Sequence, residues 1–267
     1  MAGKPKKRRG KSAQPKTAAL SNDKNRPESM AKRPARAKKR AEKPATARKP
    51  VARTKKPAAA AADAKQLVVA RTGSELREAT EPWRLNGAKL ALVPTMGALH
   101  AGHFALVEKA KATADRVIVS VFVNPTQFAP NEDLDRYPRD EASDLKRLSD
   151  LGVDLVWAPT VAQMYPDGFS TRVAPGNASK GLESDFRPHF FSGVATVVAK
   201  LFNQVRPHFA VFGEKDYQQL IVVKQLVRDL DMGLEIVPVA TVREKDELAL
   251  SSRNAYLSDA ERGVAPN

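Results

Sequence analysis

Cysteine is absent from the 267-residue chain, which excludes a disulfide framework and any metal site built on thiolates. No apolar run approaches the about 20 residues that a helix needs to cross a bilayer, and the N-terminus lacks the apolar stretch of a secretory signal. We therefore expect no membrane segment and no secretory leader. A cysteine-free chain fits the reducing cytoplasm, which is the location we predict.

Acidic residues are scarce in only one part of the chain. The net charge is +15, a value that by itself indicates nucleic acid or an anionic surface as a partner. Residues 1–62, however, carry 21 Lys and Arg against 3 Asp and Glu, whereas the remainder carries 24 basic and 27 acidic side chains. The positive excess therefore belongs to an N-terminal tail, and the rest is mildly acidic.

The tail is a low-complexity mixture of Lys, Arg, Ala and Pro without hydrophobic periodicity. Such a segment buries too little apolar surface to offset the entropy of ordering, so residues 1–64 are predicted to be disordered. Its charge would suit nucleic acid, polyphosphate or lipid head groups, although a solvated tail with no partner explains it equally well. A transit peptide is a further alternative, which the many prolines disfavour.

Beyond residue 65 the hydrophobic pattern alternates between short β-branched runs and longer helical repeats. Run 116–123 is almost continuously apolar, as expected of a parallel strand covered on both faces. Residues 65–240 are therefore predicted to form a Rossmann-like α/β domain, a parallel sheet wrapped by helices. The expected strands are 67–70, 90–93, 116–123, 153–157, 209–212 and 235–239, and the expected helices are 73–85, 104–114, 139–151, 193–205 and 217–230.

Segment 94–103, Pro-Thr-Met-Gly-Ala-Leu-His-Ala-Gly-His, joins the second expected strand to the next helix and holds two of the four histidines. Unpaired N–H groups of a first helical turn and the positive end of the helix dipole favour an anion at such a point. His100 and His103 add directional donors, so phosphate is the predicted ligand. Helix capping is the alternative role, and a metal is disfavoured because no third histidine or cysteine lies nearby.

Amide side chains follow the third expected strand. Pro125 lacks an N–H donor and ends that strand, which leaves Asn124 and Gln127 at its carboxyl end. Their neutral donors and acceptors suit hydroxyl and carboxylate groups, although a plain polar turn is the alternative.

A charged motif follows the fifth expected strand. Gly213 permits close approach of a ligand to the backbone, and Lys215 supplies a positive charge for phosphate. Asp216 can hold that lysine or accept a hydrogen bond from a ribose hydroxyl, and Gln219 lies one turn into the following helix. A surface turn is the alternative.

The fourth motif, within 248–254, places Ser251, Ser252 and Arg253 in succession. Arginine binds phosphate with two donors at once, so this segment is a candidate clamp. Ligands of parallel sheets bind beyond the carboxyl ends of the strands, where these motifs would meet. No pair of carboxylates suggests hydrolysis. Together the motifs predict attack on the α-phosphate of a nucleoside triphosphate, accelerated by positioning and electrostatic stabilisation.

The four motifs and Arg136-Tyr137-Pro138-Arg139 resemble the pantothenate synthetase (pantoate–β-alanine ligase) family in order and spacing, from about residue 66 onward. The resemblance implies the fold of the nucleotidyltransferase superfamily, with His-x-Gly-His as its HIGH signature and Ser-Ser-Arg in place of the second signature. It also implies a homodimer. Pantoate, β-alanine and ATP would be the substrates, with Mg²⁺ carried by ATP.

The family reaction has two steps, formation of pantoyl adenylate and its conversion by β-alanine to pantothenate with release of AMP. The resemblance assigns catalysis to His103, His100, Lys215 and Arg253. It assigns pantoate to Gln127, Gln219 and Asn124, and β-alanine to Gln127 as well. ATP would be bound by Met96, Gly97, Ala98, Leu99, His100, Ala101, Gly102, His103, Gly213, Glu214, Lys215, Asp216, Val242, Leu250, Ser251, Ser252 and Arg253.

Three features depart from the family pattern. Arg-Pro-Gly-His-Phe is replaced by a sequence with its histidine one place earlier, so no role is carried over to His189. Glu247 stands where the family has glycine. The family continues into a smaller C-terminal domain that closes over the site, and residues 241–267 are expected to be the start of that domain, with the rest missing. Without closure we expect weak ATP binding and slow turnover.

Two other functions stay open from the sequence. One is a nucleotidyltransferase of the same fold that lacks an amine acceptor, which the motifs around Gln127 and Gln219 disfavour. The other is a nucleic-acid-associated protein whose basic tail is functional and whose nucleotidyltransferase-like domain is inactive.

Overall fold

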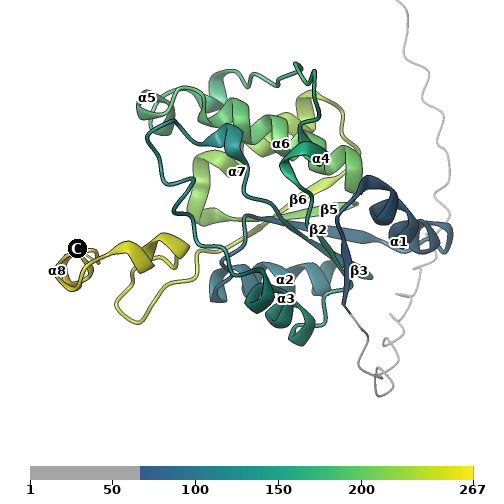
Figure 1. Cartoon of the computed structure of the whole chain (residues 1–267), viewed down its shortest axis with the longest axis horizontal. Coiled ribbons are helices and arrows are strands. Elements are labelled where there is room, and N and C mark those ends of the chain that lie inside the picture. The colour runs from purple at the N-terminus through teal and green to yellow at the C-terminus, as the bar shows by residue number, and fades with distance from the viewer. Residues whose placement is uncertain (1–66, 267) are drawn as a thin grey trace, which may run out of the picture. The chain divides into compact units, whose positions relative to one another are not determined.

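Figure 1 shows the computed structural model, which describes residues 67–266. The predictions for the basic tail lie outside the described residues. Six parallel strands form one sheet in the order β1-β4-β3-β2-β5-β6, which confirms the predicted α/β fold. The strands are β1 (Val68–Ala70), β2 (Leu90–Thr95), β3 (Arg116–Val121), β4 (Leu155–Trp157), β5 (Phe209–Gly213) and β6 (Glu235–Val239).

Helices connect the strands, and within the described residues none of them is long and apolar enough to cross a membrane. The longer ones are α1 (Gly73–Leu85), α2 (Ala101–Thr113), α3 (Glu141–Asp150), α6 (Phe190–Val205) and α7 (Tyr217–Asp229). The shorter ones are α4 (Val161–Met164), α5 (Glu183–Phe186) and α8 (Asp259–Val264), with 3-10 turns η1 (Pro125–Gln127), η2 (Asn177–Ser179), η3 (Glu214–Asp216) and η4 (Ser252–Tyr256).

Capping explains where some predicted bounds were wrong. Helix α3 begins at Glu141, two residues later than predicted, because the Ser143 N–H donates to the Asp140 carboxylate over 3.0 Å and Asp140 acts as the N-cap. Strand β3 ends at Val121, two residues earlier than predicted, and the side chain of the following Asn124 caps η1 with Pro125 in its first turn. The short helices and 3-10 turns carry too few residues for a periodic signal and were not predicted.

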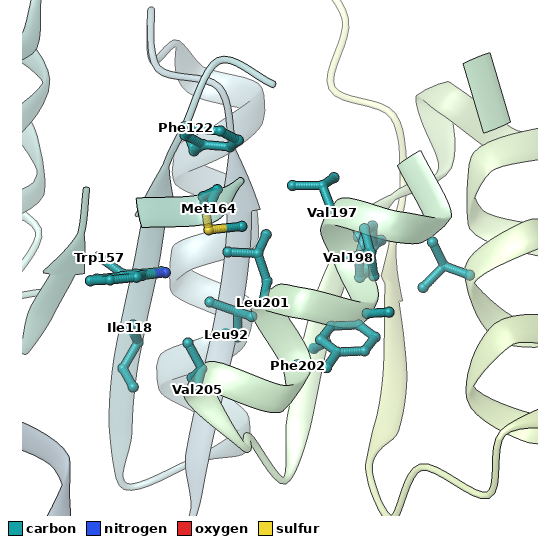
Figure 2. Packing of buried hydrophobic residues seen from close by; sticks show 14 of the residues in the cluster. Leu92, Ile118, Phe122, Trp157, Met164, Val197, Val198, Leu201, Phe202 and Val205 are labelled. Atoms are coloured by element: carbon teal, nitrogen blue, oxygen red, sulfur yellow. The ribbon is translucent and has the colours of Figure 1, made fainter. Parts of the chain in front are cut away.

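Two apolar layers enclose the sheet, because successive strand residues point to opposite faces. Helices α2 and α3 cover one face, where Val93 and Val119 of the central strands are fully buried. Helices α1, α6 and α7 cover the other face. Figure 2 shows part of that second layer, in which Leu92 and Ile118 of the sheet face Leu201 of α6. Burial on both sides explains the continuous apolar runs of the sequence.

The direction of strand addition reverses between β2 and β5. From β2 the chain adds β3 and β4 on one side, then crosses to add β5 and β6 on the other. The pairing of β2 with β5 is confined to Ala91 opposite Phe209 and Leu92 opposite Ala210, so the two strands separate beyond Leu92. Pro94, which has no N–H to donate, lies in the separated part of β2. This topological switch point is where ligands of open α/β sheets bind.

Residues 242–250 form a tight turn after the sheet. Arg243 and Ala249 make an antiparallel bridge, and the Leu250 N–H donates to the Val242 carbonyl over 3.0 Å. Glu247 has a φ of 68°, in the left-handed region that favours glycine. Glu247, which stands where the family has glycine, therefore places a side chain at a backbone conformation that favours glycine. Assignment of 241–267 to a separate domain stays a prediction.

We expect Glu247→Gly to be more stable than Glu247→Ala by about 1 kcal/mol, because alanine pays the steric penalty of the left-handed conformation and glycine does not. The order should reverse at Lys224, an exposed position within α7, where glycine is about 1 kcal/mol worse than alanine. Urea unfolding of the four variants measures both differences. The same order at both positions would contradict the strained conformation.

Candidate active site

A cavity of about 230 Å³ lies at the switch point, where residues from the ends of β2, β3 and β5 converge. Fifteen of the predicted site residues line it, contributed by all four motifs. They are Met96, His100, Gly102, His103, Asn124, Gln127, Gly213, Lys215, Asp216, Gln219, Val242, Leu250, Ser251, Ser252 and Arg253. The structure therefore brings together segments separated by up to 157 positions in the chain, Met96 to Arg253.

Five predicted ATP-binding residues do not line this cavity: Gly97, Ala98, Leu99, Ala101 and Glu214. Gly97 lies against a separate cavity. Leu99 is buried in the apolar layer under α2 and α3, while Ala101 and Glu214 are exposed to solvent. Contact of these five residues with ATP stays a prediction.

The two histidines cap the helix that carries them. The Gly102 N–H donates to His100 Nδ1 over 3.1 Å, and the His100 N–H donates to His103 Nδ1 over 3.2 Å. This corrects the expectation of unpaired N–H groups at this helix start. Because Nδ1 is the acceptor in each neutral ring, the ring proton sits on Nε2. Both imidazoles line the cavity and are hydrogen-bond donors through Nε2.

Burial keeps the His103 imidazole neutral. Desolvation, with smaller contributions from His100 and Lys215, lowers the pKa of His103 to about 3. Burial and then Lys215 also lower the pKa of His100. The ring centroids are 4.1 Å apart, so two positive charges would repel strongly. Without ligand, the fixed positive charge of the cavity therefore comes from Lys215 and Arg253.

A buried carboxylate that sequence reasoning missed holds the loop before α2. Asp144 of α3 is only 3% exposed and accepts hydrogen bonds from the Ala98 and Leu99 N–H groups, each over 2.8 Å. Arg147, one turn later, donates to the Leu99 carbonyl. These N–H groups are therefore already bonded within the protein. Asp144 therefore fixes the backbone of the loop that leads into α2, the helix that carries His103.

The side chain of Asn124 forms hydrogen bonds around its own turn, so its N–H donors are not free for a ligand. It is 1% exposed, and its Nδ2 donates to Gln127 Oε1 over 3.1 Å and to the Gly193 carbonyl over 3.3 Å. Its Oδ1 accepts from Tyr165 OH over 2.7 Å. An amide nitrogen has two donors, and both are used. Direct contact of Asn124 with pantoate stays a prediction, while its bonds orient Gln127, whose Nε2 also approaches Met96 Sδ at 3.0 Å.

Gly193 allows α6 to contact the backbone of η1. A Cβ added at this position would lie 2.3 Å from the Thr126 carbonyl oxygen and 2.9 Å from Gln127 N. No side chain fits there without displacing the turn. The position of Gln127 in the cavity therefore depends on this glycine, which sequence reasoning also missed because its partner is 67 residues earlier in the chain.

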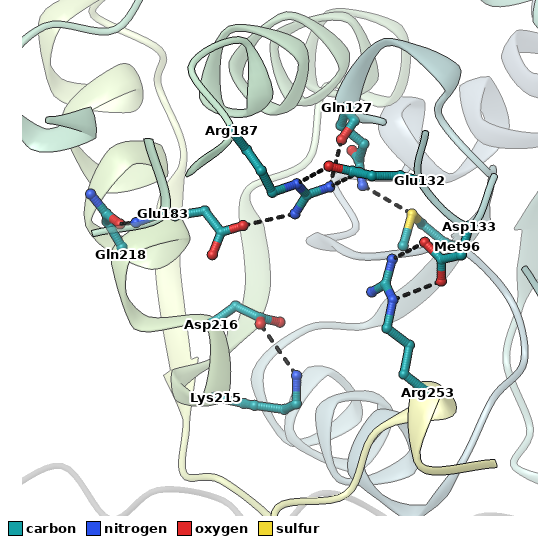
Figure 3. Close-up of polar contacts among 10 residues, drawn as sticks. All are labelled: Met96, Gln127, Glu132, Asp133, Glu183, Arg187, Lys215, Asp216, Gln218 and Arg253. Carbon is teal, nitrogen blue, oxygen red and sulfur yellow. Dashed lines mark hydrogen bonds and ion pairs between the residues drawn. The ribbon is translucent and has the colours of Figure 1, made fainter. Parts of the chain in front are cut away.

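A second cavity adjoins the first and shares six lining residues with it. These are Met96, Gln127, Lys215, Asp216, Gln219 and Arg253. Gln127 and Gln219 thus stand between two compartments. Arg187 lines the second cavity, and Figure 3 shows its guanidinium between Glu132 and Glu183, with a further bond of 2.9 Å to the Gln127 carbonyl. His189 is exposed and does not line it, whereas Phe190 does.

The Ser-Ser-Arg segment is attached to the rest of the site by polar contacts. Ser252 Oγ donates to the Ala98 carbonyl over 3.0 Å, which links this segment to the loop before α2. Arg253 makes a two-point ion pair with Asp133, at 2.9 and 3.0 Å (Figure 3). These contacts hold the segment beside the histidines.

A profile of the Pantoate-beta-alanine ligase family matches residues 68–267. The chain belongs to this family. It is 58% identical over 202 residues to a pantothenate synthetase of Rhodospirillum rubrum, covering 76% of this chain and 72% of the relative. It is 61% identical over 199 residues to one of a Bradyrhizobium species, covering 74% and 70%. The resemblance deduced from the motifs is confirmed.

Solved structures of the family share the fold. Pantothenate synthetase of Thermus thermophilus superposes with a TM-score of 0.71 at 53% identity, over 75% of this chain and 71% of that one. Pantoate-beta-alanine ligase of Francisella tularensis, solved with β-γ ATP and β-alanine, gives a TM-score of 0.72 at 40% identity, over 75% and 77%. The chain is therefore a ligase of this family, and the individual residue roles stay predictions.

The neutral His103 predicts acid sensitivity of the folded state. Its pKa is lowered to about 3 from an ordinary value of 6.5, so the unfolded chain binds this proton first. The stability that depends on the neutral ring is complete above pH 6.5 and is lost as the pH falls toward 3, with a slope of up to about 1.4 kcal/mol per pH unit. Between pH 7 and 4, the free energy of unfolding measured with denaturant should fall less steeply with pH for His103→Gln than for the wild type. Equal slopes would contradict the assignment.

The contact at Gly193 predicts a coupled loss of stability and substrate binding. Gly193→Ala should destabilise the fold by about 1–3 kcal/mol through overpacking and raise the KM for pantoate by displacing Gln127. Gly233→Ala is the matched control, because an added Cβ there meets nothing within 4 Å. Thermal unfolding and steady-state kinetics measure both effects. Indistinguishable alanine variants would contradict the contact.

Proposed function

We propose that this chain joins pantoate to β-alanine at the expense of ATP, through a pantoyl adenylate formed in the switch-point cavity. The observation that carries the proposal is the convergence of two neutral imidazole donors, Lys215, Arg253 and two glutamine amides on one cavity in a member of the ligase family. A structure of a relative with β-γ ATP and β-alanine supports the choice of those substrates.

In the first step a pantoate carboxylate oxygen attacks the α-phosphorus of ATP, and the bond to the departing diphosphate breaks. Negative charge grows on the phosphate oxygens, where preorganised donors stabilise the transition state most. We assign this role to His103 and His100 through their Nε2–H groups. Lys215 and Arg253, which both line the cavity, would neutralise the departing diphosphate.

The pantoate compartment combines an apolar wall with amide groups. Pantoate carries two methyl groups on one carbon, and side chains from α6 and the strand ends supply a matching surface. Gln127 and Gln219 would bind its hydroxyl and carboxylate groups. The apolar residues of this wall are Pro94, Phe122, Val194, Val197, Val198, Leu201 and Phe212.

In the second step the amine of β-alanine attacks the acyl carbon of pantoyl adenylate. The amide C–N bond forms, the bond to the AMP oxygen breaks, and the amine loses a proton. Gln127 borders both cavities, so we place the meeting of amine and adenylate at this residue, with β-alanine arriving through the second cavity. Holding both reactants at one boundary supplies the effective concentration that accelerates the step.

Mg²⁺, assembly and location complete the proposal. Mg²⁺ would enter bound to the ATP phosphates; Asp216 lines both cavities and offers the carboxylate oxygens that this ion prefers. We further propose a homodimer in the cytoplasm, as the family resemblance implies. The basic tail could contact nucleic acid without taking part in the reaction. The alternative of an inactive domain is disfavoured, because all four motifs reach the cavity.

The test is AMP formation that requires both pantoate and β-alanine, together with pantoate-dependent exchange of diphosphate into ATP. Gln127→Ala should raise the KM for pantoate about tenfold or more, because it removes hydrogen bonds to a buried substrate, and leave the KM for ATP nearly unchanged. Gln163→Ala, at an exposed position in α4, is the control. AMP release that ignores β-alanine would contradict the ligase function.

A further inference from the structure

The strongest feature that the proposed reaction leaves unused is the acidic partner of Arg253. Asp133 belongs to the loop between η1 and α3, and its carboxylate binds Arg253 Nε over 2.9 Å and Nη2 over 3.0 Å. The pair bridges segments 120 positions apart. Asp133 does not line either cavity that Arg253 lines, so it contacts the guanidinium from outside.

This geometry leaves part of the guanidinium available. Arginine has five N–H donors, and the Asp133 carboxylate occupies one on Nε and one on Nη2. In Figure 3 the remaining nitrogen points away from Asp133, to the side where Lys215 and Asp216 lie, and both of these residues line the cavity. A phosphate in the cavity can therefore bind the free edge while the carboxylate holds the other edge.

Two aromatic rings restrict the same side chain. The Arg253 guanidinium carbon lies 5.5 Å from the Tyr137 ring centroid and 5.9 Å from that of Phe128. Both rings are buried, whereas the Arg253 side chain is 44% exposed. A long, half-exposed side chain would otherwise lose substantial rotamer entropy when it binds phosphate.

We propose that Asp133 is a positioning residue, which fixes the Arg253 guanidinium so that its free edge meets the ATP phosphates. The proposal rests on the proposed function, because it needs Arg253 to act on ATP. The hydrogen bonds from Arg253 lower the pKa of Asp133, so the carboxylate is charged at neutral pH. A charged, two-point partner restricts an arginine more than a neutral or one-point partner does.

The experiment compares Asp133→Asn with Asp135→Asn in the full chain. Asp135 is exposed two residues away, so the control makes the same change of charge in the same loop. Binding of Mg-ATP is measured by titration calorimetry, and the KM values for ATP and pantoate and kcat are measured in the AMP assay. Asp133→Asn should weaken ATP binding and raise the KM for ATP about fivefold or more, with the KM for pantoate within about twofold of wild type.

A double substitution separates positioning from general damage. In an Arg253→Gln background, Asp133→Asn should have no further effect on ATP binding, because the group that it positions is gone. The thermal unfolding midpoint should change little, because a half-exposed ion pair contributes little to stability.

Three results would overturn the proposal. Equal effects of the two asparagine variants would show that only loop charge matters. Tighter ATP binding by Asp133→Asn would show that the carboxylate competes with phosphate for Arg253. An undiminished effect in the Arg253→Gln background would show that Asp133 acts through another group. If wild type binds Mg-ATP but forms no AMP, the proposed function fails, and the binding comparison still tests the role of Asp133.

Discussion

The separation of β2 from β5 beyond Leu92 is the constraint on which the site depends. Two parallel strands that stayed paired would satisfy each other's backbone groups and leave no space between their ends. Here the pairing stops after two residue pairs, and the chain adds strands in opposite directions from that point. The carboxyl ends of β2 and β5 therefore open a cavity in which the histidine motif and Lys215 face each other. The apolar layer under α6 forms its wall, so the same packing that stabilises the sheet shapes the substrate compartment.

The protein's own groups occupy the donors that a bare helix start would offer to phosphate. Asp144 takes the N–H groups of Ala98 and Leu99, and the imidazoles of His100 and His103 take two more. The result is a rigid loop whose positive character reaches the cavity through imidazole Nε2–H groups. Donors held in this way need no reorganisation when charge develops on a phosphate. A neutral imidazole also avoids adding a third positive charge beside Lys215 and Arg253.

Most strands and the four motifs could be predicted from the sequence because their signals are local. Continuous β-branched runs mark strands buried on both faces, and polar motifs directly after them mark the ligand edge of a parallel sheet. Asp144, Gly193 and Asp133 could not be predicted in this way. Asp144 has the pattern of an ordinary polar residue in an amphipathic helix. Its structural role is a hydrogen bond to the backbone of a loop 45 residues earlier. Gly193 and Asp133 matter through contacts 67 and 120 residues away, which no local periodicity encodes.

The Ser-Ser-Arg segment is held by polar contacts, whereas the other three motifs follow elements that are anchored by apolar packing. Turn η4 contributes no buried residue, whereas α2, β3 and β5 are anchored in the apolar layers. Its place beside the histidines comes from Ser252 on the Ala98 carbonyl and from Arg253 on Asp133, contacts that individually contribute about 1 kcal/mol or less. A triphosphate that binds Arg253 adds a contact of comparable or greater strength. Under the proposed role of Arg253, binding of ATP and placement of this segment are coupled, and each stabilises the other by the same free energy.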